Sequence, residues 1–119
     1  MNKIYTLLNC TTCQKILDQI KDKDRFDIQN IKEHPLTEAQ LEELYQYTGS
    51  YEKLFSKRAQ LYRQLDLKNK NLTEKDYKHY LLEHYTFLAR PVVLFDGQIF
   101  IGNAPKKVQH MLDVVNEGL

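Results

Sequence analysis

Residues 4–17 read IYTLLNCTTCQKIL, and this stretch contains both cysteines of the 119-residue chain, Cys10 and Cys13. The apolar residues before Cys10 lack helical spacing, which is typical of a short strand. After Cys13 the apolar residues recur at helical spacing as far as Ile20. The stretch therefore predicts a strand that runs through a loop into a helix, and the helix should begin within the cysteine motif.

A second strand is expected over residues 26–31, where apolar and polar residues partly alternate. The helix should end in the charged residues 21–25 that precede this strand. A strand, a helix and a strand in this order form a β-α-β unit, whose crossover is almost always right-handed. The two strands are therefore predicted to be parallel.

The middle of the chain, approximately residues 32–89, carries helical signals and no convincing strand. Thr37 and Gln40 have the spacing of a capping box at a helix start. Gly49 interrupts that helix, and Thr73 can cap a later one. We expect this region to be a helical insertion and not a linker.

Strands return after Arg90 and Pro91. Residues 92–95 and 98–101 are β-prone, and the Asp96-Gly97 pair between them is a strong signal for a two-residue hairpin. These two strands should therefore be antiparallel.

A last helix is expected to open at Pro105, because apolar residues recur after it at spacings of three and four. The complete order is β-α-β, helical insertion, β-β-α. This order indicates an α/β protein with a thioredoxin-like core, interrupted by the insertion, in a single domain over residues 1–119.

Length and composition limit the class of protein. A chain of 119 residues fits one domain. Seventeen Lys and Arg against sixteen Asp and Glu give a net charge of +1, so no global charge attracts nucleic acid or an anionic membrane. No apolar run approaches the ~18 residues of a membrane span, and residues 1–5 lead into a strand instead of a signal peptide. We expect a cytoplasmic protein that binds neither nucleic acid directly nor a membrane.

In a reducing compartment, a pair such as Cys10 and Cys13 more often serves chemistry than structure. A cysteine at a helix N-terminus faces unpaired N–H groups and the positive end of the helix dipole, and both favour the thiolate. Cys10 precedes the helix and is predicted to be the nucleophile, whereas Cys13 in the first turn is predicted to resolve the mixed disulfide. The hydroxyl and N–H groups of Thr11 and Thr12 can donate to the thiolate.

Two other interpretations of the pair are half of a structural zinc site and two incidental cysteines. A closed zinc site usually has four ligands, and the chain has neither a second cysteine pair nor histidines at a spacing that completes one. We therefore expect no metal and no resident cofactor.

Several segments together resemble the arsenate reductase and Spx family, and the resemblance covers essentially the whole chain. The segments are Tyr5-Thr6, Cys10-Thr11-Thr12-Cys13-Gln14-Lys15, Asn30-Ile31, Arg58 and Leu88-Ala89-Arg90-Pro91-Val92-Val93. The resemblance implies a thioredoxin-like core with a helical insertion, Cys10 as the reactive cysteine, Arg90 as its cationic neighbour and Pro91 as a cis proline. It also makes Arg58 a candidate for anion binding, together with Thr11 and Thr12.

Departures from the family pattern bear on the substrate. The two-cysteine motif is more similar to Spx than to the glutaredoxin-coupled arsenate reductases, whose motif has one cysteine followed by an arginine. Gln14, Ser56 and Gly102 stand where arsenate-reducing members have arginines. Because oxyanion binding needs positive charge and forked donors, we expect weak or absent arsenate reduction. The sequence also ends at Leu119, without the extra C-terminal segment of Spx proteins.

The favoured function is therefore a thiol-disulfide oxidoreductase that reduces a disulfide substrate and is regenerated by an external thiol reductant, such as glutathione with glutaredoxin, or thioredoxin. One alternative is an arsenate reductase coupled to the same reductants. Another is an Spx-like redox-sensing transcriptional regulator that binds RNA polymerase. The missing arginines weigh against the first alternative and the short C-terminus against the second.

Overall fold

A computed structural model describes residues 2–117 of the chain. The chain divides into two compact units. The sheet unit combines the residues up to His34 with those from Arg90 onward, and the helical unit is Pro35–Ala89. Both cysteines lie in the sheet unit.

The sheet unit contains its strands and helices in the predicted order. Its elements are β1 (Lys3–Thr6), α1 (Thr11–Asp18), a 3-10 turn (Lys23–Arg25), β2 (Asp27–Asn30), β3 (Val92–Phe95), β4 (Gln98–Ile101) and α5 (Pro105–Val115). The strand order is β2-β1-β3-β4. β1 is parallel to β2 and antiparallel to β3, and β3 is antiparallel to β4. The α/β class, the parallel β-α-β unit and the hairpin are thus confirmed.

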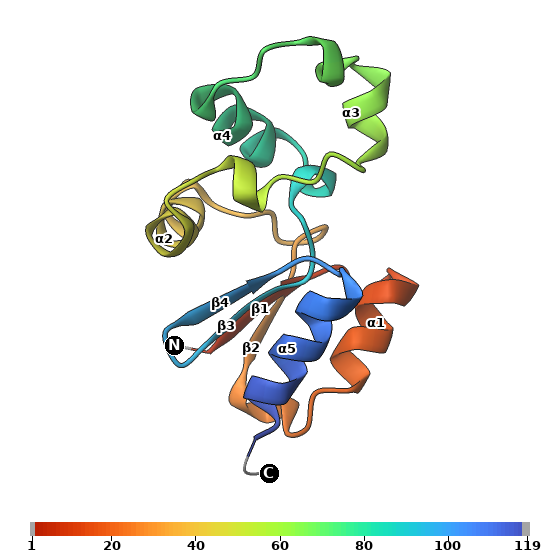
Figure 1. Cartoon of the computed structure of the whole chain (residues 1–119), viewed down its shortest axis with the longest axis vertical. Coiled ribbons are helices and arrows are strands. Elements are labelled where there is room, and N and C mark those ends of the chain that lie inside the picture. The colour runs from red at the N-terminus through yellow and green to blue at the C-terminus, as the bar shows by residue number, and fades with distance from the viewer. Residues whose placement is uncertain (1, 118–119) are drawn as a thin grey trace. The chain divides into compact units, whose positions relative to one another are not determined.

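Helices α1 and α5 lie side by side against one face of the sheet (Figure 1). Their apolar faces meet inward-pointing residues of β1 and β3 in one buried cluster. Its buried members are Ile4, Ile16, Leu17, Ile20, Phe26, Val93, Phe95, Met111, Leu112 and Val115. The helical spacing of apolar residues in the sequence therefore marks the faces that pack on the sheet.

Helix α1 ends at Asp18, earlier than the charged residues 21–25 where the sequence predicts its end. The N–H groups of Gln19 and Ile20 bond to carbonyls only three residues back, at 3.1 and 3.0 Å, which tightens the last turn. Ile20 nevertheless remains buried in the core, 3% exposed.

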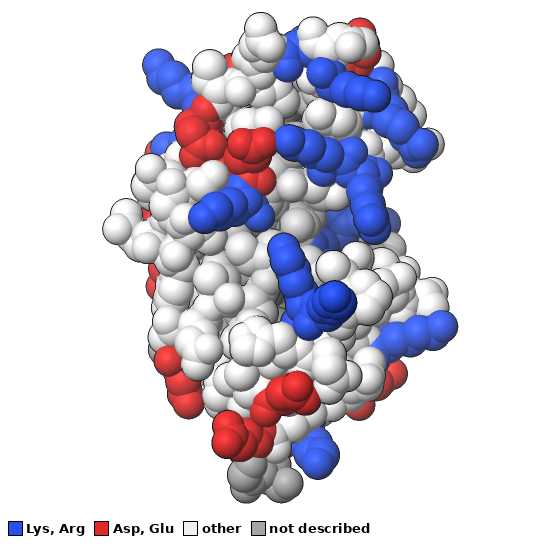
Figure 2. Space-filling view, in the orientation of Figure 1, with Lys and Arg blue, Asp and Glu red and all other residues white. Residues whose placement is uncertain are grey.

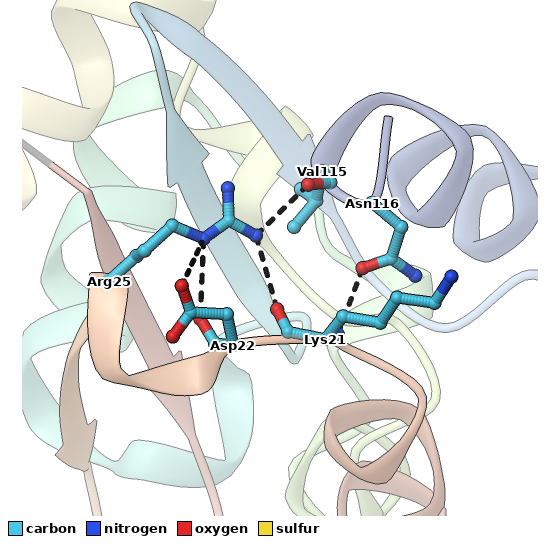
Figure 3. A network of polar contacts seen from close by, with 5 residues as sticks. All are labelled: Lys21, Asp22, Arg25, Val115 and Asn116. Carbon is cyan, nitrogen blue, oxygen red and sulfur yellow. Dashed lines mark hydrogen bonds and ion pairs between the residues drawn. The ribbon is translucent and has the colours of Figure 1, made fainter. Parts of the chain in front are cut away.

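Arg25 ties the loop after α1 to the end of α5 (Figure 3). Its guanidinium donates to the carbonyls of Lys21 at 3.1 Å and Val115 at 3.0 Å. The side-chain oxygen of Asn116 accepts from the Lys21 N–H at 2.9 Å. These bonds satisfy backbone groups at the end of both helices and fix the end of the unit opposite to the N-terminus of α1.

The helical unit contains α2 (Glu38–Thr48), α3 (Gln60–Gln64), α4 (Glu74–Glu83) and three 3-10 turns (Glu52–Leu54, Leu67–Asn69 and Tyr85–Phe87). The capping box at Thr37 and Gln40 is present, with both hydrogen bonds at 3.1 Å. Gly49 ends α2 at a φ of 66°, a left-handed conformation that glycine adopts readily. Thr73 caps α4 as predicted.

Aromatic rings fill the interior of the helical unit. Phe55 stacks on Phe87 with ring centroids 5.1 Å apart and meets Tyr77 edge-on at 4.9 Å. Tyr51 donates from its hydroxyl to Glu42 at 2.6 Å, and burial together with this bond raises the pKa of Tyr51 to about 12.

No helix within residues 2–117 is long and apolar enough to cross a membrane.

Candidate active site

Cys10 is the N-cap residue of α1. Its backbone is extended, with φ −101° and ψ 119°, and its carbonyl accepts the first helical hydrogen bond from Gln14 N at 2.9 Å. Its own N–H donates to Leu7 O at 3.3 Å, which closes the loop after β1. Cys10 makes no side-chain capping bond. The strand, the loop and the helix together therefore hold the thiol at the positive end of α1.

The Gln14 side chain stabilises this loop. Its Nε2 atom donates to the carbonyl of Leu8 at 2.7 Å. The sequence shows Gln14 only as a position where relatives have an arginine and gives no signal for this contact, because the contact depends on the path of the loop. The neutral side chain thus supports the loop geometry and adds no charge to the site.

The two thiols differ in exposure. Both are free cysteines; Cys10 is half-buried and Cys13 is 1% exposed. Partial burial disfavours the Cys10 thiolate, but hydrogen bonds from the Cys13 backbone and thiol and from the Thr12 N–H outweigh it, with the charge of Arg90 adding to them. The pKa of Cys10 is consequently lower than that of an ordinary thiol.

For Cys13, burial outweighs the hydrogen bonds that favour the thiolate, and the pKa is therefore raised. The N–H of Leu7 and the hydroxyl of Thr6 favour its thiolate, whereas the neighbouring Cys10 disfavours it. The pair is therefore asymmetric, with an accessible thiol that ionises early and a buried thiol that ionises late.

Arg90 and Pro91 directly precede β3. The Arg90–Pro91 peptide bond is cis, Pro91 is buried, and Arg90 is half-buried and close enough to Cys10 to favour its thiolate. Gly102 donates from its N–H to Pro91 O at 2.9 Å and has a φ of 87°. An arginine at Gly102 would be strained in this backbone conformation.

The other predicted site residues divide between the two units. Thr11 and Thr12 are the first two residues of α1, and both side chains are exposed. Arg58 is an exposed residue of the helical unit, where its N–H donates to the Ser56 hydroxyl at 3.3 Å. The sheet unit therefore brings together Cys10, Cys13 and Arg90, and an anion-binding role for Arg58 stays a prediction.

A pocket of about 310 Å³ lies beside the cysteine motif between α1 and α5. Thr12 and Lys15 line it from α1, and Pro105 and Val108 line it from α5. Lys106 and Lys107, in the first turn of α5, are exposed, and Figure 2 shows Lys and Arg side chains on the face of the molecule seen in this view. Within residues 2–117, no three His, Cys, Asp or Glu side chains lie close enough together to hold a metal ion.

The family of this chain follows from a match over most of its length. The model of the ArsC family matches residues 5–111. The chain belongs to the ArsC family. The resemblance to arsenate reductases and Spx is thereby confirmed.

Two curated relatives of this ArsC-family chain are transcriptional regulators. It is 21% identical to the global transcriptional regulator Spx of Bacillus subtilis (strain 168) and 23% identical to the global transcriptional regulator Spx 1 of Oceanobacillus iheyensis. Each alignment covers 94% of this chain and 87% of the relative.

A solved arsenate reductase from Vibrio cholerae shares the fold, with a TM-score of 0.74 and 21% sequence identity. The similarity covers 99% of this chain and 97% of that protein. This likeness shows the fold, and the chain is therefore an ArsC-family member with a thioredoxin-like fold that is similar to proteins named as transcriptional regulators and as an arsenate reductase.

Proposed function

We propose that this ArsC-family protein is a thiol-disulfide oxidoreductase in which Cys10 is the nucleophile and Cys13 is the resolving cysteine. The observation that carries the proposal is the asymmetry of the pair. Cys10 is accessible and its pKa is lowered, whereas Cys13 is buried in the first turn of α1 and its pKa is raised. A nucleophile must ionise before its substrate arrives, and a resolving thiol needs to ionise only afterwards.

The reaction uses the two thiols in sequence. The Cys10 thiolate attacks one sulfur of a substrate disulfide, the substrate S–S bond breaks, and one substrate thiolate leaves and takes a proton from water. Cys13 then loses its proton to water and attacks Cys10 Sγ, which breaks the mixed disulfide and releases the second substrate thiolate. Two electrons pass to the substrate, and a Cys10–Cys13 disulfide remains.

A thiol reductant must return these two electrons. We propose glutathione with glutaredoxin, or thioredoxin, as this external partner, and no resident cofactor. Reduction of the Cys10–Cys13 disulfide by either donor is the reverse exchange through Cys10, the more accessible sulfur.

Turnover of a small disulfide tests the proposal. The native protein should reduce an aromatic disulfide catalytically with thioredoxin or glutathione as donor, and its oxidised form should lack two protons by mass without an intermolecular adduct. Cys13→Ser is the matched variant that keeps the nucleophile and should stop at the mixed disulfide. A native protein that accumulates the mixed disulfide, or a dimer linked through Cys10, would contradict the resolving role of Cys13.

A second candidate function is an Spx-like redox-sensing regulator, which the names of the two curated relatives favour. In this function a Cys10–Cys13 disulfide would change the start of α1 and so a partner surface. RNA polymerase is the partner that the resemblance to Spx implies. Binding of the reduced and oxidised proteins to purified RNA polymerase tests it, and equal absence of binding in both states would exclude this partner.

Arsenate reduction is proposed to be weak or absent. Gln14 supports the loop through Leu8, and Gly102 has a backbone conformation unsuited to an arginine, so neither position supplies a forked cation to an oxyanion. Each missing charge-assisted contact removes ~1.5–3 kcal/mol of binding. Robust arsenate turnover by the native protein, abolished by Cys10→Ser, would overturn this expectation.

A further inference from the structure

Thr6, the last residue of β1, has a buried hydroxyl that is left without a hydrogen-bond partner among residues 2–117. The residue is 0% exposed, and its Oγ1 atom has no hydrogen-bond partner within the described part of the chain. Buried polar atoms are nearly always paired, so an exception needs a reason. The backbone carbonyl of Thr6 is satisfied separately, by Ile31 N at 3.0 Å.

The strand geometry directs this hydroxyl toward α1. Side chains alternate across a strand, so Thr6 lies on the same face of β1 as Ile4. Ile4 packs in one cluster with Ile16 and Leu17 of α1. Those two residues and Cys13 are the buried residues of α1, so they share its inner face. The side chain of Thr6 therefore points under the first turn of α1, at the level of Cys13.

Few polar groups reach the Cys13 sulfur. The Thr6 hydroxyl and the Leu7 N–H are the donors that favour its thiolate, and Cys10 is the titratable group beside it. The charge of Arg90 favours the thiolate of Cys10. A neutral thiol is a weak acceptor and leaves the Thr6 hydroxyl unsatisfied, whereas a thiolate is a strong acceptor for it.

We propose that Thr6 is a positioning residue for the resolving step, whose hydroxyl donates a hydrogen bond to the Cys13 thiolate as it forms and attacks Cys10 Sγ. This inference rests on the proposed oxidoreductase function. The hydroxyl keeps its own proton; the Cys13 proton passes to water, and the mixed-disulfide bond breaks as the Cys10–Cys13 bond forms. The hydroxyl is already buried near this turn of α1 and makes no other hydrogen bond among the described residues, so it can turn toward the thiolate when the charge appears.

The test uses one equivalent of an aromatic nitrobenzoate disulfide whose released thiolate absorbs visible light. The attack of Cys10 releases one thiolate, and resolution by Cys13 releases the second, so stopped-flow mixing separates the two steps. Thr6→Val removes the hydroxyl at nearly constant shape, and Thr6→Ser retains it. We expect the first phase to be unchanged in both variants, and the second to slow roughly tenfold or more in Thr6→Val and to stay near native in Thr6→Ser.

A second measurement reports on the contact independently of turnover. In a Cys10→Ser background, the alkylation rate of Cys13 against pH should shift to higher pH when Thr6 is changed to Val, because the thiolate loses a donor, and should be restored by Ser. Thermal unfolding should show no loss of stability in Thr6→Val, because Val removes an unsatisfied buried hydroxyl.

The outcomes separate the two proposals. A native-like second phase in Thr6→Val, or equal slowing in Thr6→Ser and Thr6→Val, would overturn the role of Thr6 while resolution by Cys13 stands. A native protein with no second phase would overturn the resolving role itself. In that case an unshifted Cys13 alkylation profile in Thr6→Val would overturn the contact as well, and a shifted profile would support it.

Discussion

The helical unit and the sheet unit use the N-terminus of a helix in opposite ways. In the helical unit, Thr37 and Thr73 cap α2 and α4, and their hydroxyls accept the N–H groups of Gln40 at 3.1 Å and Asp76 at 3.3 Å. In the sheet unit, Cys10 occupies the same position on α1 and makes no side-chain capping bond. Instead, the N–H groups at the start of α1 favour the Cys10 thiolate.

The difference shows that one physical feature can serve stability or chemistry according to the residue at the N-cap. A threonine hydroxyl satisfies an orphan N–H permanently and stabilises the helix by about 1 kcal/mol. A cysteine leaves the N–H groups to a charge that appears and disappears during a reaction. Helix α1 thus lacks part of the stabilisation that α2 and α4 have, and its packing on the sheet and the bonds of Arg25 hold it in place.

The largest expected effect is that of Cys10→Ser. We expect complete loss of disulfide turnover, because serine is not ionised at neutral pH. Serine is also a good N-cap residue, so the free energy of unfolding should stay unchanged or rise by up to about 1 kcal/mol. Turnover assays and urea denaturation of the same sample measure both quantities. A loss of stability would contradict the view that α1 lacks the stabilisation that a capping side chain gives to α2 and α4.

The next largest effect is expected at the other end of α1. Arg25→Met removes the guanidinium bonds to Lys21 and Val115 while keeping an apolar stem over Phe26 and Phe95. We expect a loss of roughly 1.5–3 kcal/mol in the free energy of unfolding, because these bonds involve a charged donor. The alkylation rate of Cys10 should be unchanged. A slower rate would mean that the C-terminal end of α1 also controls the thiol.

The pH dependence of Cys10 alkylation measures how strongly the start of α1 and Arg90 favour the thiolate. Because its pKa is lowered, the thiolate should persist to lower pH than that of an ordinary thiol, whereas Cys13 should react only at higher pH. Arg90→Gln should raise the pKa of Cys10 and slow alkylation at neutral pH by up to roughly tenfold. Lys107→Gln, an exposed cation on α5, is the control and should leave the profile in place.

The smallest effect is expected for the cap of α2. Thr37→Ala should lower the free energy of unfolding by about 1 kcal/mol, and Thr37→Ser should restore most of it. The Cys10 alkylation rate should match the native rate in both variants. Denaturation midpoints with equal slopes measure the stability change, and a native midpoint in the alanine variant would show that the capping box contributes nothing measurable.

The sequence alone determined the order of the elements and the position of the thiols. Apolar periodicity, the Asp96-Gly97 hairpin pair and the caps at Thr37 and Thr73 act over a few residues, so their outcome can be read without the rest of the chain. The placement of Cys10 at a helix start follows for the same reason. Local signals were less reliable at the end of α1, where a tightened last turn stops the helix before the charged residues.

Tertiary structure alone decided the surroundings of the thiols. The bond from Gln14 to Leu8 and the buried hydroxyl of Thr6 depend on how the strands, the loop and α1 pack together. Composition and spacing carry no information on which side chains meet after packing. The positions of the two cysteines predict which one is the nucleophile. Only the packed structure shows that Cys13 is buried, and this burial raises its pKa because removing a thiol from water disfavours its ionised form.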